Sequence, residues 1–274
     1  MPASSAPEAS SPATSREQRH ALVVFVHGFG SSPDTWSVLA PLLRESTEIR
    51  QDQRFWAYES RFYPSRFRPW LRRRRDEALP QLGESLWSFI QASYDPTVHN
   101  SIIPIGHSLG GLVIASMLSR VVPTASVQKD PPAALRALHS PILIASPLLG
   151  ANFARQWRRI YRKFGANVHF DDLLPSSTRR NTEVSRFVYA VEAGQISPHF
   201  YRARNDELVG FAGLVPDALK GANYRPCESL DGNHSDCLRV VTDSSLRLLA
   251  RSIDTVEEVR LGQWPDIGLR QEDD

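Results

Sequence analysis

Short apolar runs alternate with amphipathic stretches along most of the chain. The runs Ala21–Val26, Ile102–Ile105 and Pro141–Ala145 are continuous and rich in aliphatic residues, which predicts strands buried on both faces of a parallel sheet. Leucines at helical spacing between residues 79 and 90 predict an amphipathic crossover helix. The pattern therefore predicts an α/β fold with a mainly parallel central sheet of about six strands and helices on both faces.

This alternation stops at both ends of the chain and changes once in its interior. Residues 1–19 are rich in Ser, Pro and Ala without apolar periodicity, which predicts a disordered tail. Residues 257–274 are predicted to form a C-terminal tail, so the folded domain spans 20–256. Between 151 and 198 the alternation breaks, which predicts a helical cap or lid insertion.

An aromatic stripe at helical spacing begins this insertion, opposite a basic face. The stripe consists of Phe153, Trp157, Ile160, Tyr161 and Phe164. Such a helix is compatible with a cap whose stripe stays packed, with a mobile lid over a substrate, or with peripheral contact to an anionic membrane surface. Trp157 is the residue of this stripe that we expect on the substrate side.

The composition says more about the binding partners and the location of the protein than about its fold. The 274 residues carry a formal net charge of +2, which argues against a nucleic-acid partner. The N-terminus has no apolar signal region and no long apolar run follows, so a cytoplasmic location is expected. Cys227 and Cys237 are too few for a disulfide framework, but they bracket His234 and are either free or a single bridge beside it.

The stretch IIPIGHSLGGL places Ser108 where a predicted strand meets a predicted helix. A serine at so sharp a turn is strained, and large residues two positions before or after it would collide. Glycine occupies both positions, as Gly106 and Gly110. The pattern predicts a nucleophilic serine. Pro104 within the strand is expected to cause a local bulge, because proline lacks the N–H of a ladder bond.

A serine hydroxyl needs a base, and the base needs a third group that fixes its tautomer. In α/β-hydrolases, whose nucleophilic serine lies on a turn of this kind, an acid and then a histidine follow the serine in the chain. Of the eight histidines only His199 and His234 lie late enough, and His234 follows the last predicted strand. Asp206 is the expected acid, with Glu207 as its rival.

Two backbone N–H groups are expected to bind the oxyanion, those of Phe29 and Leu109. Phe29 belongs to HGFG, which follows the first strand, and its glycines allow close approach to a substrate. Besides Trp157, the residues expected on the substrate side are His27, Gly28, His107, Pro147 and Leu148.

The motifs HGFGSS, GHSLGG and ASPLLGA together resemble the serine lipase and esterase branch of the α/β-hydrolases. More narrowly they resemble serine esterases related to the GPI inositol-deacylase and SERAC-like groups. The likeness spans residues 21–151 and, through NDELV and GNHSD, 199–240. The family usually has Thr-Pro-His where this chain has Ser146, Pro147 and Leu148. The resemblance implies an α/β-hydrolase fold and carboxylic ester hydrolysis through an acyl-enzyme.

The expected activity is therefore ester hydrolysis by Ser108, His234 and Asp206, without a metal or organic cofactor. The apolar cap segment favours a lipid or another small-molecule ester with a hydrophobic acyl group. A thioesterase, an amidase or an acyltransferase would use the same triad, and a noncatalytic binding protein could keep the same fold. The sequence does not separate these activities, and it does not indicate an oligomeric state.

Overall fold

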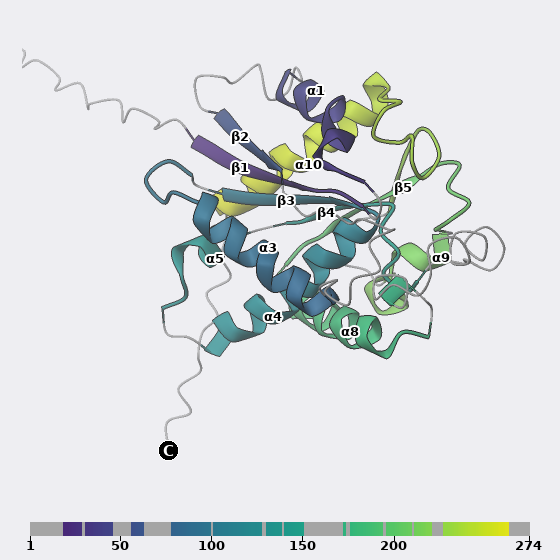
Figure 1. The fold of residues 1–274 in the computed structure, drawn as a ribbon. Helices are drawn as coiled ribbons and strands as arrows, with labels where there is room; N and C mark the ends of the chain where they lie inside the picture. The colour runs from purple at the N-terminus through teal and green to yellow at the C-terminus, as the bar shows by residue number, and fades with distance from the viewer. Residues whose placement is uncertain are drawn as a thin grey trace, which may run out of the picture.

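A computed structural model gives the fold of the chain (Figure 1). The residues that it describes are 19–28, 31–45, 56–62, 78–99, 101–127, 130–138, 140–150, 172–173, 176–193, 196–209, 211–220 and 227–262. Residues 1–18 of the predicted tail 1–19 and the aromatic stripe 153–164 lie outside these residues, whereas Arg19 begins the first strand. No helix in these ranges is long and apolar enough to cross a membrane.

A six-stranded parallel sheet forms the centre of the molecule (Figure 1). Its spatial order is β2-β1-β3-β4-β5-β6. Strand β2 therefore forms one edge beside β1, and the chain then crosses from β3 to the other edge at β6. The strands are β1 (Arg19–Val26), β2 (Trp56–Phe62), β3 (Ser101–His107), β4 (Ile142–Ile144), β5 (His199–Ala203) and β6 (Glu228–Leu230). The predicted parallel sheet of about six strands is confirmed.

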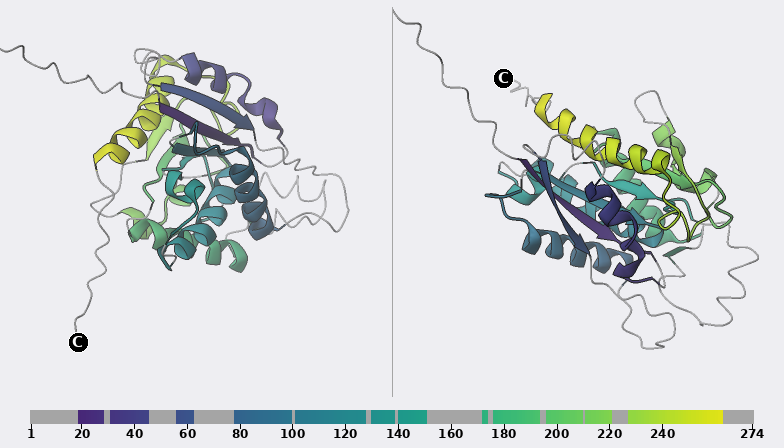
Figure 2. Two further views of the ribbon diagram at one scale, coloured as in Figure 1. Left: turned by 90° about the vertical axis from the view of Figure 1, so that its left-hand side faces the viewer. Right: turned by 90° about the horizontal axis from the view of Figure 1, so that it is seen from above.

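Helices cover both faces of the sheet (Figure 2). The helices on one face are α3 (Leu79–Ser93), α4 (Leu109–Val127), α5 (Ala133–Ala137) and α8 (Thr178–Glu192). The elements on the other face are the 3-10 helix η1 (Pro33–Trp36) and the helices α1 (Leu39–Glu45) and α10 (Asp243–Gly262). Two short elements lie between β5 and β6: α9 (Phe211–Leu214) and the 3-10 helix η2 (Asp217–Lys220).

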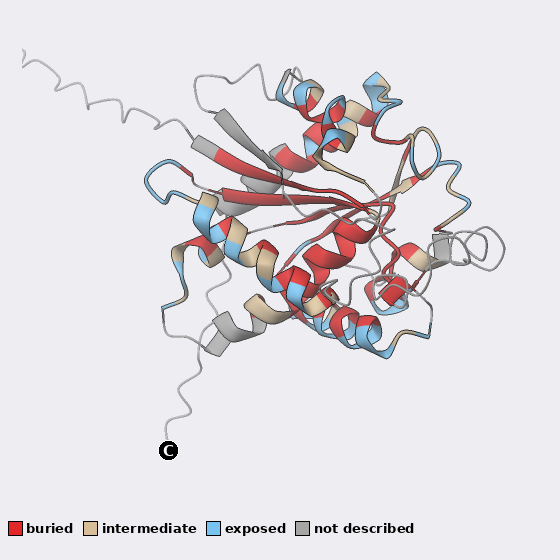
Figure 3. Ribbon diagram, viewed as in Figure 1, coloured by how far each residue is buried: buried red, intermediate tan, exposed pale blue. Residues whose placement is uncertain are grey.

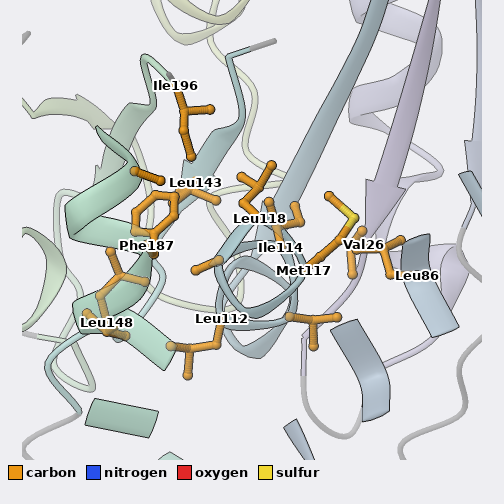
Figure 4. Packing of buried hydrophobic residues seen from close by; sticks show 14 of the residues in the cluster. Val26, Leu86, Leu112, Ile114, Met117, Leu118, Leu143, Leu148, Phe187 and Ile196 are labelled. Carbon is orange, nitrogen blue, oxygen red and sulfur yellow. The ribbon is translucent and has the colours of Figure 1, made fainter. Parts of the chain in front are cut away.

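Each face of the sheet has its own apolar core. Strand β3 is buried along its whole length, as expected for a central parallel strand (Figure 3). Helix α4 contacts α3, α8 and strand β3, and its residues from Leu109 to Ser119 are all buried. Figure 4 shows Leu112 and Leu118 of α4 among Leu86 of α3 and Phe187 of α8. This packing holds α4, and the turn that precedes it, in a fixed position.

Residues 178–192, within the predicted cap insertion, form part of the layer that covers the sheet. Helix α8 packs on α4 through a buried charged group, because Glu183 accepts hydrogen bonds from Ser116, Ser119 and Arg120 at 2.8–3.1 Å. Of the described residues between β4 and β5, helix α8 provides a crossover helix on this face of the sheet. An amphipathic pattern does not distinguish a crossover helix from a cap helix, which is why the sequence assigned residues 178–192 to the predicted cap insertion.

Pro104 does not cause the predicted bulge, and that prediction is wrong. The β1–β3 register is continuous from Ala21↔Ser101 to Val26↔Gly106, with Pro104 opposite Val24. The N–H of Ser108 bonds to Ile144 of β4, and backbone groups alternate sides, so the nitrogen of Pro104 faces β4 as well. Pairing with β4 begins only at Ile105, so the missing N–H falls before the ladder starts.

Candidate active site

Ser108 lies at the tip of the turn between β3 and α4, at the carboxyl edge of the sheet. Its φ is +54°, a left-handed conformation that is unusual for any residue other than glycine. Its N–H donates to the carbonyl of Ile144 at 2.9 Å, which ties the turn to the neighbouring strand. The strained conformation is thus held from both sides, by the β4 hydrogen bond and by the packed helix α4.

The two glycines that flank Ser108 are required by close packing. A Cβ at Gly106 would lie 2.7 Å from the backbone nitrogen of Gly111, and one at Gly110 would overlap the carbonyl oxygen of Val26. Both neighbours are backbone atoms that a rotamer change cannot move. The predicted reason for these glycines is confirmed.

We expect Gly110→Ala to destabilise the fold by about 2 to 3 kcal/mol, because the new methyl group forces β1 and α4 apart. Alanine favours helix more than glycine does, so propensity alone predicts the opposite sign. The midpoint of urea unfolding measures the difference. A variant as stable as the wild-type protein would contradict the close approach of Val26 and Gly110.

His234 joins Ser108 to Asp206 through two hydrogen bonds. Its Nε2 lies 2.9 Å from Ser108 Oγ, and its Nδ1 lies 2.8 Å from Asp206 Oδ2. A carboxylate only accepts, so Nδ1 carries the proton and donates to Asp206. In the neutral ring Nε2 then accepts from the serine hydroxyl. This tautomer allows the imidazole to take the serine proton.

The carboxylate of Asp206 is oriented by its own turn. Its Oδ1 accepts from the N–H groups of Leu208 and Val209, both at 2.9 Å, which leaves Oδ2 for His234. The side chain is only 2% exposed. The adjacent Glu207 is exposed instead. Of these two rival acids the structure places Asp206, and not Glu207, at the histidine.

The other carboxylates near His234 in sequence have different partners. Asp231 accepts from Thr242 at 2.7 Å and pairs with Arg204 at 3.0 Å. Asp236 accepts from the side chain of Asn233 at 2.7 Å, within the turn that carries His234. Both therefore shape the loop after β6.

The region where an oxyanion would form lies at the start of α4. The first N–H groups of a helix have no partner inside the helix and carry its positive dipole end, and Leu109 is the first residue of α4. Gly28 lies close by, because a Cβ built on it would be 2.9 Å from Ser108 Cβ. Phe29, the other predicted donor, is outside the described residues, so both oxyanion assignments stay predictions.

The predicted substrate-side residues are mostly covered by protein. His27 is fully buried, with its Nδ1 at 3.0 Å from the carbonyl of Gly28, and Pro147 and Leu148 are also buried. Trp157 lies outside the described residues. These positions surround the turn but present little surface to a substrate, so a direct contact stays untested.

His107 is also buried, and it contacts His234 instead of open space. It is 5% exposed, and its Nε2 lies 2.7 Å from the carbonyl oxygen of His234. Burial, together with the nearby His234, lowers the pKa of His107 to about 3, so the ring is neutral at physiological pH. The sequence reveals no such pairing, because these residues are distant in the chain.

The two cysteines are both free. Cys227 packs against the apolar core on the α3 and α4 face, whereas Cys237 belongs to the core on the α10 face. Burial raises the pKa of Cys227 to about 11 and that of Cys237 to about 12. Both side chains are therefore uncharged thiols, and the bridge considered from the sequence is absent.

A cavity of about 590 Å³ opens beside His234, between the loops that follow β5 and β6. Most of its lining is polar, and the residues that matter for charge and hydrogen bonding are Asn205, Glu207, Asn233, His234 and Asp236. The side chains in this wall favour a hydrophilic group.

Comparison with known proteins gives a family and a fold. The sequence profile described as "Alpha/beta hydrolase family" matches residues 23–252. No curated protein sequence matches the chain. Similar solved structures include the peroxisomal alpha-beta-hydrolase Lpx1 of Saccharomyces cerevisiae, with a TM-score of 0.54 and 12% identity over 96% of this chain and 83% of that one.

Two bacterial structures are similar to a comparable degree. A lipase-esterase related protein of Clostridium acetobutylicum has a TM-score of 0.52 and 13% identity, covering 86% of this chain and 94% of its own. The Bacillus licheniformis lipase BlEst2 has a TM-score of 0.51 and 15% identity, covering 90% of this chain and 96% of its own. At such identities these likenesses support the fold alone.

Proposed function

Because the chain belongs to the alpha/beta hydrolase family, we propose that it is a serine hydrolase that cleaves carboxylic esters through an acyl-enzyme. The observation that carries this proposal is the chain of hydrogen bonds from Ser108 through His234 to Asp206, at 2.9 and 2.8 Å, on a strained turn. A lipase and a lipase-esterase related protein are among the structures of similar fold, so we choose esters as the proposed substrates.

In the first half of the reaction Ser108 Oγ attacks the ester carbonyl while His234 Nε2 takes the hydroxyl proton. The carbonyl oxygen becomes an anion, which the N–H groups of Leu109 and Phe29 stabilise. Asp206 stabilises the positive charge that forms on His234. The C–O bond to the alcohol then breaks, and His234 returns its proton to the departing alkoxide.

The second half repeats these steps with water. His234 Nε2 takes a proton from water, and the hydroxide attacks the acyl carbon of the Ser108 ester. When the C–O bond to Ser108 breaks, the serine oxygen recovers a proton from His234. The products are one alcohol and one acid, and the protein returns to its starting state without any oxidant or reductant.

We infer the place of the alcohol part of the ester from the proton transfer that releases it. The leaving oxygen must receive its proton from His234, so the alcohol departs on the side of this ring. The acyl group is expected to be hydrophobic, on the evidence of the apolar stripe in residues 153–164 of the sequence.

A fluorophosphonate probe tests the proposed function directly, because it reacts only with an activated serine. We expect rapid labelling, with the adduct located on Ser108 by peptide mass spectrometry. A panel of p-nitrophenyl esters of increasing acyl length, with matching thioesters and anilides, then measures which acyl compound is turned over. A folded protein that takes up no probe and cleaves no ester would point to a noncatalytic binding protein.

A further inference from the structure

The residue before the nucleophile makes a contact that the reaction itself does not use. His107 ends strand β3, and its Nε2 lies 2.7 Å from the main-chain oxygen of His234. A carbonyl oxygen only accepts a hydrogen bond, so Nε2–H of His107 is the donor. The dipeptide His107–Ser108 therefore contacts His234 twice, at its main chain and at its ring.

The neutral ring of His107 keeps its hydrogen on Nε2 at physiological pH, so Nε2–H stays a donor. The ring is 5% exposed and neutral, so it carries one hydrogen, and the contact places that hydrogen on Nε2. Its Nδ1 is buried and accepts no hydrogen bond from the residues that the structure describes. The ring of His107 lies 5.1 Å from that of His234 at a 42° tilt, so the two rings also contact each other.

Other hydrogen bonds attach the loop that carries His234 to the residues after β5. The N–H of Asn205 donates to Gly232 at 3.0 Å, and Asp206 holds Nδ1 of His234, so both attach the loop to the residues after β5. The thiol of Cys237 reaches the same His234 carbonyl only at 3.6 Å, and a thiol is a weak donor. Among the residues that the structure describes, the bond from His107 attaches the main chain of this loop to strand β3.

We propose that His107 is a positioning residue for the catalytic base: its Nε2–H holds the His234 carbonyl so that the imidazole stays in reach of Ser108. This inference rests on the proposed function, because it assigns His107 a part in the same reaction. His107 touches no reacting atom. It acts by fixing the distance between nucleophile and base from a single rigid element, the end of β3.

The test compares two substitutions at residue 107 with one at another buried histidine. His107→Phe keeps an aromatic ring but removes the donor, and His107→Gln keeps an N–H at similar reach. The control is His99→Phe. His99 is also buried, at 3% exposed, and its ring accepts a hydrogen bond from the N–H of Asp95 at 3.0 Å. It precedes the start of β3, at the opposite end of this strand from His107. Each variant is assayed for thermal unfolding, kcat, KM and the rate of fluorophosphonate labelling.

We expect His107→Phe to lower kcat and the labelling rate by about 10- to 100-fold, as for other groups that orient a reacting residue. KM should change little, since no substrate contact is removed, and His107→Gln should restore most of the rate. His99→Phe should lower the unfolding temperature without changing kcat per folded molecule. Proton NMR adds a readout that needs no activity, because the Nδ1–H of His234 bonded to Asp206 gives a far-downfield signal, which we expect to broaden in His107→Phe.

Two results would overturn the inference. One is a folded His107→Phe variant that labels at the wild-type rate and keeps a sharp downfield signal. The other is an equal loss in the Phe and Gln variants, which would assign the effect to packing. If His107→Phe does not fold, His107→Leu serves as the donor-free variant. Failure of the wild-type protein to label would instead contradict the proposed function, and the NMR signal would still test the contact.

Discussion

Ser108→Ala should leave a folded protein whose kcat for ester hydrolysis is lower by a factor on the order of 10⁶. Without Oγ no acyl-enzyme forms, and the hydroxyl that His234 Nε2 contacts at 2.9 Å is gone. His234→Ala should cost about as much, because the two residues act as one unit and the serine proton then has no acceptor. Steady-state hydrolysis of a short p-nitrophenyl ester measures both losses.

The double variant Ser108→Ala, His234→Ala distinguishes a unit from two independent contributions. We expect it to be no slower than either single variant. The control is Ser88→Ala, which removes an exposed hydroxyl bonded to the Glu84 carbonyl on α3 and should leave kcat unchanged. Losses that multiply in the double variant would show that Ser108 and His234 act separately, against the proposed mechanism.

A glycine at position 108 should remove activity but raise the stability of the fold. Ser108 has a φ of +54°, and glycine adopts this conformation without the cost of about 1 kcal/mol or more that other residues carry. Ser108→Gly would therefore remove both strain and activity. The nucleophile position is thus one where the sequence gives up stability to place a side chain at the edge of the sheet.

The parts of the site that could be predicted from sequence are those governed by short-range geometry. Gly106 and Gly110 are needed because the turn brings backbone atoms close, and this follows from the turn alone. Asp206 could be preferred over Glu207 because of its position in the loop after a predicted strand, and the structure adds that its Oδ1 accepts from its own turn.

The parts that could not be predicted depend on which surfaces meet in three dimensions. The bond between His107 and His234 joins the end of β3 to the loop after β6, with β4 and β5 between these strands in the sheet, and no local pattern marks it. Pro104 also depends on a neighbouring strand, but here the neighbour removes a problem that the sequence predicted. Its tolerance follows from where β4 starts, at a residue that pairs with Ile105, and a rule for isolated strands cannot supply this.

Asp206→Asn should lower kcat by about 10⁴-fold while the fold stays intact. The N–H groups of Leu208 and Val209 require an acceptor at the Oδ1 position, so the amide oxygen of asparagine will occupy it. The amide NH₂ then faces His234 Nδ1 and donates to it. His234 must carry its proton on Nε2, where it can no longer accept the proton of Ser108.

The matched control is Asp231→Asn, which alters another carboxylate at the same edge of the sheet. Asp231 pairs with Arg204 and Thr242, so its loss should cost about 1 kcal/mol of stability or less and leave the tautomer of His234 unchanged. Nitrogen-15 NMR of labelled histidine reports the tautomer directly. An Asp206→Asn variant that keeps kcat within about tenfold of the wild-type value, or that keeps the proton on Nδ1, would show that another group orients the base.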